Sequence, residues 1–162
     1  MRIPSHHKRG VGLIEIVIGV GIFVVIVVSL LGAYRFFVRF SGTTAQTTKA
    51  YFLLEEGLEV ARVLRDANWE TLSTLSVETP YYLSFSGNMW SPTSTPVVID
   101  STFYRTITLS NVYRDGDEDI AETGTLDPNT YFVTATVSWF RGGATTTRTL
   151  STYITNLFQV VE

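Results

Sequence analysis

The sequence contains no cysteine among its 162 residues. Disulfide bonds, thiolate metal sites and cysteine nucleophiles are therefore excluded. Histidine is almost as scarce, since the two that occur, His6 and His7, stand next to each other. Charge is missing from a long segment, because Glu15 is the one charged residue between Val11 and Tyr34. These absences leave little material for a catalytic centre and direct attention to the apolar segment.

The apolar segment is long enough to cross a membrane. Its 24 residues contain two polar ones, Glu15 and Ser29, and as a helix they span about 36 Å. A secretory signal peptide is the nearest alternative, but its apolar region is typically about 7 to 15 residues long and leads to a small-residue cleavage site. Residues 32–40, GAYRFFVRF, offer no good site of that kind. The sequence therefore predicts a membrane-spanning helix.

Glu15 requires an explanation, because a charged group near the centre of a hydrocarbon layer costs about 2.5 to 3.5 kcal/mol on insertion scales. One explanation is a partner of opposite charge. The other is an ordinary membrane anchor, in which the side chain reaches the interface from near the helix end.

Residues 9–15, RGVGLIE, resemble the class III signal of type IV pilins and type II secretion pseudopilins. In that family a basic leader ends in glycine, a prepilin peptidase cuts after it, and a glutamate stands five residues later. The resemblance implies cleavage between Gly10 and Val11, methylation of the new Val11 amine, and a role for Glu15 in filament assembly. The sequence departs from the common pattern in having Val11 and Gly12 where phenylalanine and threonine are usual.

The resemblance also implies partners for the chain. In these filaments the glutamate is thought to meet the N-terminal amine of a neighbouring subunit, which here is the amine of Val11. Pairing two charges in an apolar medium offsets much of their desolvation cost. The implied partners are the prepilin peptidase, other pilin or pseudopilin subunits, the inner-membrane assembly platform and membrane lipid.

The charge distribution favours an envelope protein. The leader carries Arg2, Lys8 and Arg9 without an acid, which favours its retention in the cytoplasm. From Ser41 onward, seven Lys and Arg face fourteen Asp and Glu, a net charge of −7. Direct nucleic-acid binding is not expected, because it relies on cations that neutralise phosphates.

We therefore expect a leader peptide at residues 1–10, a transmembrane and assembly helix at 11–40, and an extracytoplasmic pilin-like domain at 41–162. The expected location is the inner (cytoplasmic) membrane, crossed once, with the leader in the cytoplasm and the C-terminal domain outside it. The protein would then enter a periplasmic or surface filament.

The helix is expected to continue through residues 45–67 with an amphipathic pattern. Apolar residues recur there at spacings of three and four and form one stripe that suits a sheet: Tyr51, Leu54, Leu58, Ala61 and Leu64. On the polar side the spacing predicts the pairs Glu59–Arg62 and Arg62–Asp66.

Residues 57–69, GLEVARVLRDANW, look like a segment of V-type minor pilins and I-type minor pseudopilins. The alternative interpretation needs no family. It is a helix that ends near Asn68, with Trp69 packing back on the core.

The later sequence predicts strands at residues 81–85, 103–114, 130–141 and 144–154, rich in threonine, valine and aromatic residues. Gly142 and Gly143 suit a two-residue hairpin turn. From Val133 to Trp139 apolar and hydroxyl residues alternate, as in a sheet with one buried face. The predicted class is α+β: a long N-terminal helix, half membrane and half amphipathic, packed on a C-terminal antiparallel sheet.

One acidic cluster raises the question of a metal site: Asp115, Asp117, Glu118, Asp119 and Glu122. An EF-hand that began at Asp115 would need glycine and glutamate where Ile120 and Leu126 stand. A solvated loop between strands is preferred, because Asp, Gly and Asn favour turns without any metal. We expect no metal and no cofactor.

The sequence indicates a structural protein and not an enzyme. Both histidines lie in the leader that processing would remove, so a mature chain has none for catalysis. The resemblance makes a minor pilin or pseudopilin the preferred function. The cysteine pair of many type IVa major pilins is missing, which argues against a major pilin of that kind. The alternative is a membrane-anchored extracytoplasmic binding module that does not polymerise.

Overall fold

The computed structural model describes residues 12–157. The chain forms two compact units, of which the first ends at Ala45 and the second begins at Gln46. The predicted cleavage and methylation site, Gly10 and Val11, lies outside the described residues.

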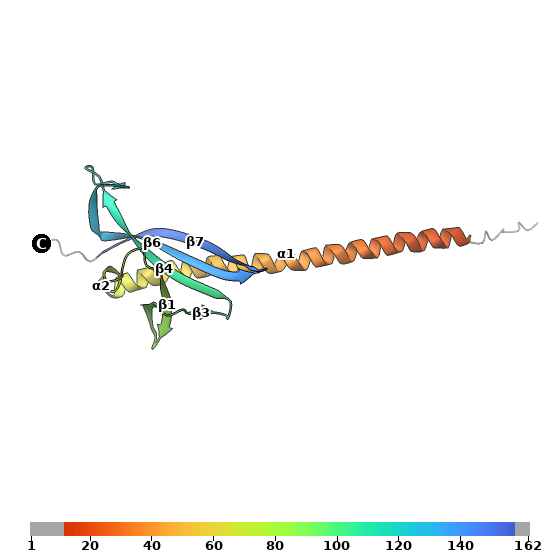
Figure 1. The fold of residues 1–162 in the computed structure, drawn as a ribbon, viewed down its shortest axis with the longest axis horizontal. Coiled ribbons are helices and arrows are strands. Elements are labelled where there is room, and N and C mark those ends of the chain that lie inside the picture. Colours follow the sequence, from red (N-terminus) through yellow and green to blue (C-terminus); the bar gives the residue numbers. More distant parts are fainter. Residues whose placement is uncertain (1–11, 158–162) are drawn as a thin grey trace, which may run out of the picture. The chain divides into compact units, whose positions relative to one another are not determined.

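Helix α1 runs from Leu13 to Ala67 and contributes residues to both units (Figure 1). At its start the backbone N–H of Glu15 donates a hydrogen bond to the carbonyl of Gly12 at 2.9 Å. At its end the side chain of Asn68 accepts the N–H of Glu70 at 2.9 Å, and a single-turn helix α2, Glu70–Ser73, follows. The helix therefore ends where the sequence predicts.

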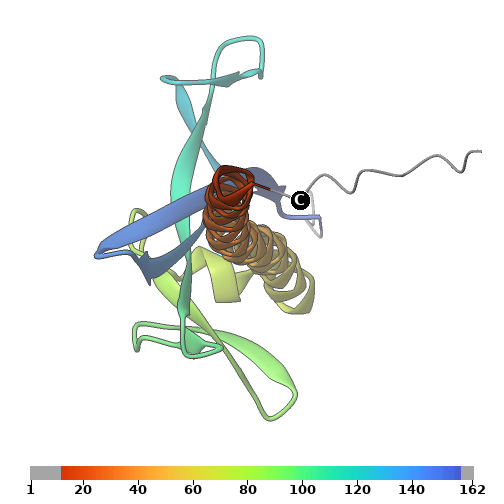
Figure 2. The same ribbon diagram turned by 90° about the vertical axis from the view of Figure 1, so that its right-hand side faces the viewer.

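The second unit contains a sheet of seven antiparallel strands in the order β2-β1-β4-β6-β7, with β3 and β5 pairing to β4. The strands are β1 (Tyr81–Ser86), β2 (Met89–Thr93), β3 (Val98–Ile99), β4 (Phe103–Arg114), β5 (Ile120–Ala121), β6 (Thr125–Arg141) and β7 (Ala144–Thr155). Figure 2 shows the β1–β2 hairpin and the loop after β4 at opposite ends of this unit. A long N-terminal apolar helix followed by an antiparallel sheet is an α+β arrangement.

The four predicted strands all form. β4 has the predicted bounds, and β1, β6 and β7 extend one to five residues beyond theirs. The β6–β7 hairpin turns at Gly142 and Gly143, whose φ angles are 58° and 89°, so both glycines adopt the positive values that such a turn needs. β2 was not predicted, because it contains Pro92; β2 lies at the edge of the sheet, where a missing N–H is tolerated.

A bulge separates the two parts of β6. Asn111 of β4 pairs with Tyr131, whereas the next residue, Val112, pairs with Asp127. The three residues between Asp127 and Tyr131 therefore have no partner in β4. They include Pro128, a residue that bulges accommodate. This explains why the predicted strand began only at Thr130.

The hydrophobic core of the second unit lies between the sheet and the part of α1 that belongs to that unit. The predicted stripe is right at Leu54, Leu58, Ala61 and Leu64, which are all buried. It is wrong at Tyr51, which is 50% exposed. The residue before it, Ala50, is completely buried and occupies the buried face of the helix instead. The other buried helix residues are Leu53, Gly57 and Val60. From the sheet, the predicted alternation is confirmed, since Val133, Ala135, Val137 and Trp139 are buried.

Candidate functional site

The first unit presents an apolar helix surface on all sides. Apart from Val27, large aliphatic and aromatic side chains from Leu13 to Phe40 are at least half exposed, with Leu13 itself at 83%. The most apolar part of α1 has none of its residues buried, and by length and composition it could cross a membrane. Such a surface is stable only where lipid or other apolar helices cover it.

Glu15 lies in the first turn of α1, among this apolar surface. Its carboxylate is close to the positive end of the helix dipole, which favours a negative charge there. Within residues 12–157 its side chain has no hydrogen bond or ion pair. The predicted partner, the amine of Val11, belongs to the residues that the structure does not describe.

Ser29, the other polar residue of the segment, satisfies its hydroxyl inside the helix. The side chain donates to the carbonyl of Val25 at 2.8 Å. This hydrogen bond satisfies the hydroxyl, so that it can lie in an apolar environment at little cost in free energy. Glu15 is therefore the one polar side chain of residues 12–33 that has no hydrogen bond or ion pair.

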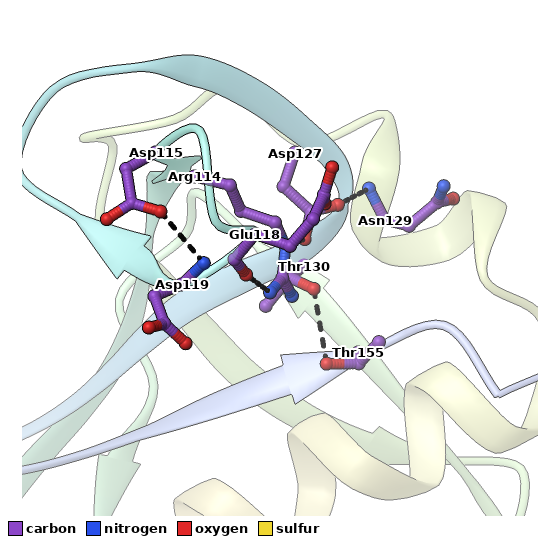
Figure 3. A network of polar contacts seen from close by, with 8 residues as sticks. All are labelled: Arg114, Asp115, Glu118, Asp119, Asp127, Asn129, Thr130 and Thr155. Atoms are coloured by element: carbon purple, nitrogen blue, oxygen red, sulfur yellow. Dashed lines mark hydrogen bonds and ion pairs between the residues drawn. The ribbon is translucent and has the colours of Figure 1, made fainter.

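The acidic loop of the second unit is organised by Arg114, as Figure 3 shows. The Nε of Arg114 donates to Oδ2 of Asp127 at 2.8 Å, and its Nη1 donates to the carbonyl of Glu118 at 2.7 Å. Within the loop, Oδ1 of Asp115 accepts the backbone N–H groups of Asp117 and Asp119 at 2.9 and 3.1 Å. One arginine thus joins the tip of the loop to the beginning of β6.

Asp127 is the charged partner in this arrangement. Burial raises the pKa of Asp127, but hydrogen bonds from Arg114, from the backbone N–H of Asn129 and from Thr130, together with the charge of Arg114, lower it, and the net pKa is below its ordinary value. Asp127 is therefore ionised at neutral pH and accepts hydrogen bonds with both oxygens.

The loop does not gather its carboxylates toward one point. Among the described residues, no group of three or more Asp, Glu, His or Cys side chains is placed to hold a metal ion. Asp115 uses an oxygen for the turn instead. A cleft of about 370 Å³ lies beside the loop, and Arg114, Asp127 and Thr130 are among its lining residues. Residues 115–120 are all exposed, as in the solvated loop that the sequence predicts.

The sequence does not predict the buried charge at Arg105. Its side chain is 3% exposed and its Nη1 binds Oε2 of Glu56 on α1 at 2.5 Å. The guanidinium also lies over the ring of Trp90, 5.3 Å from the centroid. The sequence contains one indication of it. Side chains alternate between the two faces of a strand, so Arg105 lies on the same face of β4 as Phe103 and Ile107, and a charge buried on that face needs a partner.

The segment 57–69 shows the local packing expected without any family. Trp69 follows the end of α1 and stacks on Tyr131, with the ring centroids 5.5 Å apart. The pair Glu59–Arg62 forms as predicted. The pair Arg62–Asp66 does not, because Asp66 binds Arg65 at 2.8 Å.

The structure thus keeps the sequence-predicted residues in separate places. Glu15 lies in the first unit and the acidic loop in the second, which also contains the Glu56–Arg105 pair that the sequence does not predict. In comparisons with known proteins, no family model, no curated protein and no solved structure matches the chain.

Proposed function

We propose that the chain is a minor pilin or pseudopilin, a structural subunit that is cut by prepilin peptidase and assembles through its N-terminal helix. The filament would be a type IV pilus or a type II secretion-like filament. The observation that carries the proposal is Glu15, an unpaired carboxylate in the first turn of an exposed apolar helix, five residues after Gly10.

The proposed mechanism uses two properties of the helix. Its apolar side chains hold the precursor in the membrane and afterwards pack against the helices of other subunits. Cleavage after Gly10 creates a positive amine at Val11, and a neighbour's amine then pairs with Glu15. Because the carboxylate lacks a partner inside the described chain, a partner on another subunit would remove the cost of an unpaired charge.

The location follows from the same segment. The cations of the leader favour a cytoplasmic N-terminus, so the domain after the helix lies outside the inner membrane. Within the family, the resemblance of residues 57–69 favours a V-type minor pilin or an I-type minor pseudopilin.

A membrane-anchored binding module is the second candidate, because the same helix is long and apolar enough to act only as an anchor. It would keep its leader and would not polymerise. The two candidates therefore differ in the N-terminus of the mature protein.

The test is mass-spectrometric identification of that N-terminus in the envelope fraction. We expect the mature chain to begin at Val11 with a methylated amine. Gly10→Val should block cleavage, whereas Gly12→Ala, which changes the next glycine, should leave it intact. An intact Met1, or a mature start beyond Tyr34, would contradict the proposal.

A further inference from the structure

Two arginines follow the most apolar part of α1. Arg35 and Arg39 are four residues apart, so their side chains lie on the same face of the helix, about one turn from each other. Both are exposed, and Arg35 has no hydrogen bond or ion pair within residues 12–157. Residues 16–54 contain no Asp and no Glu. The helix around this arginine pair therefore carries no negative charge.

Aromatic side chains accompany the arginine pair. Tyr34, Phe36, Phe37 and Phe40 are between 61% and 72% exposed, and the rings of Phe36 and Phe40 stack with their centroids 6.2 Å apart. Residues 34–40 thus combine exposed rings with cations, unlike the aliphatic helix before them. Such a mixture suits the boundary between hydrocarbon and headgroups, where a side chain meets an apolar layer and a wet one.

The distance between Glu15 and Arg35 agrees with the thickness of a bilayer. The two residues are 20 positions apart on one continuous helix, which corresponds to about 30 Å. Residues 16–34 between them carry no charge. The hydrocarbon core of a bilayer is also about 30 Å thick. A helix along the membrane normal can therefore place these two charges at opposite surfaces of the hydrocarbon.

The arginine pair also fits within one layer of lipid headgroups. Arg35 and Arg39 are separated by about 6 Å along the helix axis. Each headgroup layer is about 5 to 8 Å thick, since a bilayer measures about 40 to 45 Å with its headgroups and about 30 Å without them. The phosphate groups of this layer are anions that guanidinium groups bind with charge-assisted hydrogen bonds.

We propose that Arg35 and Arg39 bind the phosphate groups of phospholipids at the extracytoplasmic surface of the membrane and thereby fix the depth of α1. The inference rests on the membrane location given under the proposed function, and it applies equally to a pilin subunit and to an anchored module. In the inserted chain, Val25 then lies at the centre of the bilayer. Glu15 lies at the cytoplasmic surface, where water reaches its carboxylate. Its pairing with the amine of Val11 belongs to the assembled state, in which other helices replace the lipid.

The depth of α1 can be measured with the full chain in vesicles of phosphatidylglycerol and phosphatidylcholine. Because the chain has no cysteine, a spin label can be attached to single cysteines placed one at a time at positions 20–30. The exposure of each label to oxygen dissolved in the lipid, relative to a water-soluble nickel complex, reports its depth. We expect the deepest label at Val25 or at a residue next to it. A deepest position three or more residues away would overturn the proposal.

Removal of both cations should shift the helix. In the double variant Arg35→Leu and Arg39→Leu the apolar segment extends to Phe40, so its midpoint moves from residue 25 to about residue 28. The deepest label should therefore move by about three residues toward the C-terminus, whereas Lys at both positions should keep it at Val25. An unchanged depth in the leucine variant would overturn the proposal.

Phosphate binding is tested by the lipids that surround the protein. Spin-labelled phosphatidylglycerol should be enriched beside the chain relative to labelled phosphatidylcholine, and the leucine variant should lower this enrichment several-fold. Lys49→Leu is the matched control. It removes the next cation of α1, which pairs with Asp100 at 2.7 Å, and should change neither depth nor enrichment. Equal enrichment for wild type and the leucine variant would overturn the assignment of the arginines to phosphate.

These outcomes are separate from those that test the proposed function, because they need only the chain and lipid. A protein that is cut after Gly10 but has its deepest position far from Val25 would contradict the depth alone. A protein that has the expected depth but keeps Met1 in its host would contradict the pilin assignment alone.

Discussion

A Cβ atom added to Gly57 would lie 3.3 Å from the Cβ of Ala135 and 3.2 Å from the Cδ of Arg105. Gly57 is therefore a point of close approach between the second unit's part of α1 and the sheet. Glycine costs about 1 kcal/mol in a helix relative to alanine. At this position the missing side chain allows the helix and the sheet to approach closely.

Gly57→Leu should lower the free energy of unfolding of the second unit by about 1 to 3 kcal/mol, because extra methylenes in a packed core force neighbours to move. Loss of the β-sheet circular-dichroism signal on heating would measure it. Glu55→Leu introduces the same side chain on the exposed face of the same helix and should change the melting temperature little. Equal melting temperatures for both variants would contradict the close packing at Gly57.

Asp127→Asn should destabilise the protein at neutral pH by about 1 to 3 kcal/mol, because hydrogen bonds to a charged group are lost. The pKa of Asp127 is lowered from 3.8 in the folded state, so the unfolded state binds the proton more readily. The stabilisation by the ionised carboxylate is complete at pH values above the ordinary pKa of the unfolded state. It is lost as the pH falls through the lower pKa of the folded state.

The measurement is chemical denaturation of both proteins from pH 7 down to about pH 2. The difference between wild type and Asp127→Asn should shrink toward zero at the acid end. Asp117→Asn changes an exposed carboxylate of the same loop and serves as the control. A difference that does not depend on pH would show that the ionised form of Asp127 is not what stabilises the fold.

Calcium and chelator should leave the melting temperature unchanged. The reason is that Asp115 already accepts two backbone N–H groups and the other acids of the loop do not converge. Thermal melts in millimolar calcium and in excess chelator would check this expectation. A loss of several degrees with chelator would identify a bound ion, since a ligand of the native state stabilises it.

Glu15→Ala should leave membrane insertion and cleavage intact but impair filament incorporation. Insertion becomes easier because the helix becomes more apolar. A neighbour's Val11 amine would then enter the filament core unpaired, at a cost of about 3 to 5 kcal/mol. Cross-linking to other pilins in the native host measures incorporation, and Ile16→Ala, which removes apolar volume beside it, is the control. Undiminished incorporation of Glu15→Ala would mean that the carboxylate is an incidental interfacial charge.

Local patterns predict much of this fold. Alternation along β6 and the paired glycines of the β6–β7 hairpin are properties of adjacent residues, so the sequence reveals them directly. At Pro92 and Pro128 the sequence predicts no strand, because proline cannot donate a hydrogen bond to a neighbouring strand. Such a proline is compatible with a strand only at certain positions in a sheet. An edge and a bulge, the two places that accept it, become visible only when the strands are paired.

The buried and charged contacts were harder to predict. Arg114 and Asp127 meet because β4 and β6 pair in one register, and Glu56 meets Arg105 across 49 residues of sequence. Nothing in the local pattern states which helix residue lies above a given strand residue. Likewise, Tyr51 belongs to the helical stripe by its spacing, but the sheet approaches the helix on the side of Ala50 and Gly57.

The Glu56–Arg105 contact also fixes how far the helix can slide along the sheet. A shift of one helical turn, about 5.4 Å, would replace Glu56 with Phe52 or Val60, and neither side chain can accept a hydrogen bond. The guanidinium would then be left inside the core without its counter-charge. The pair therefore selects one axial position of this part of α1 on the sheet, because a shift of one turn in either direction would break the ion pair.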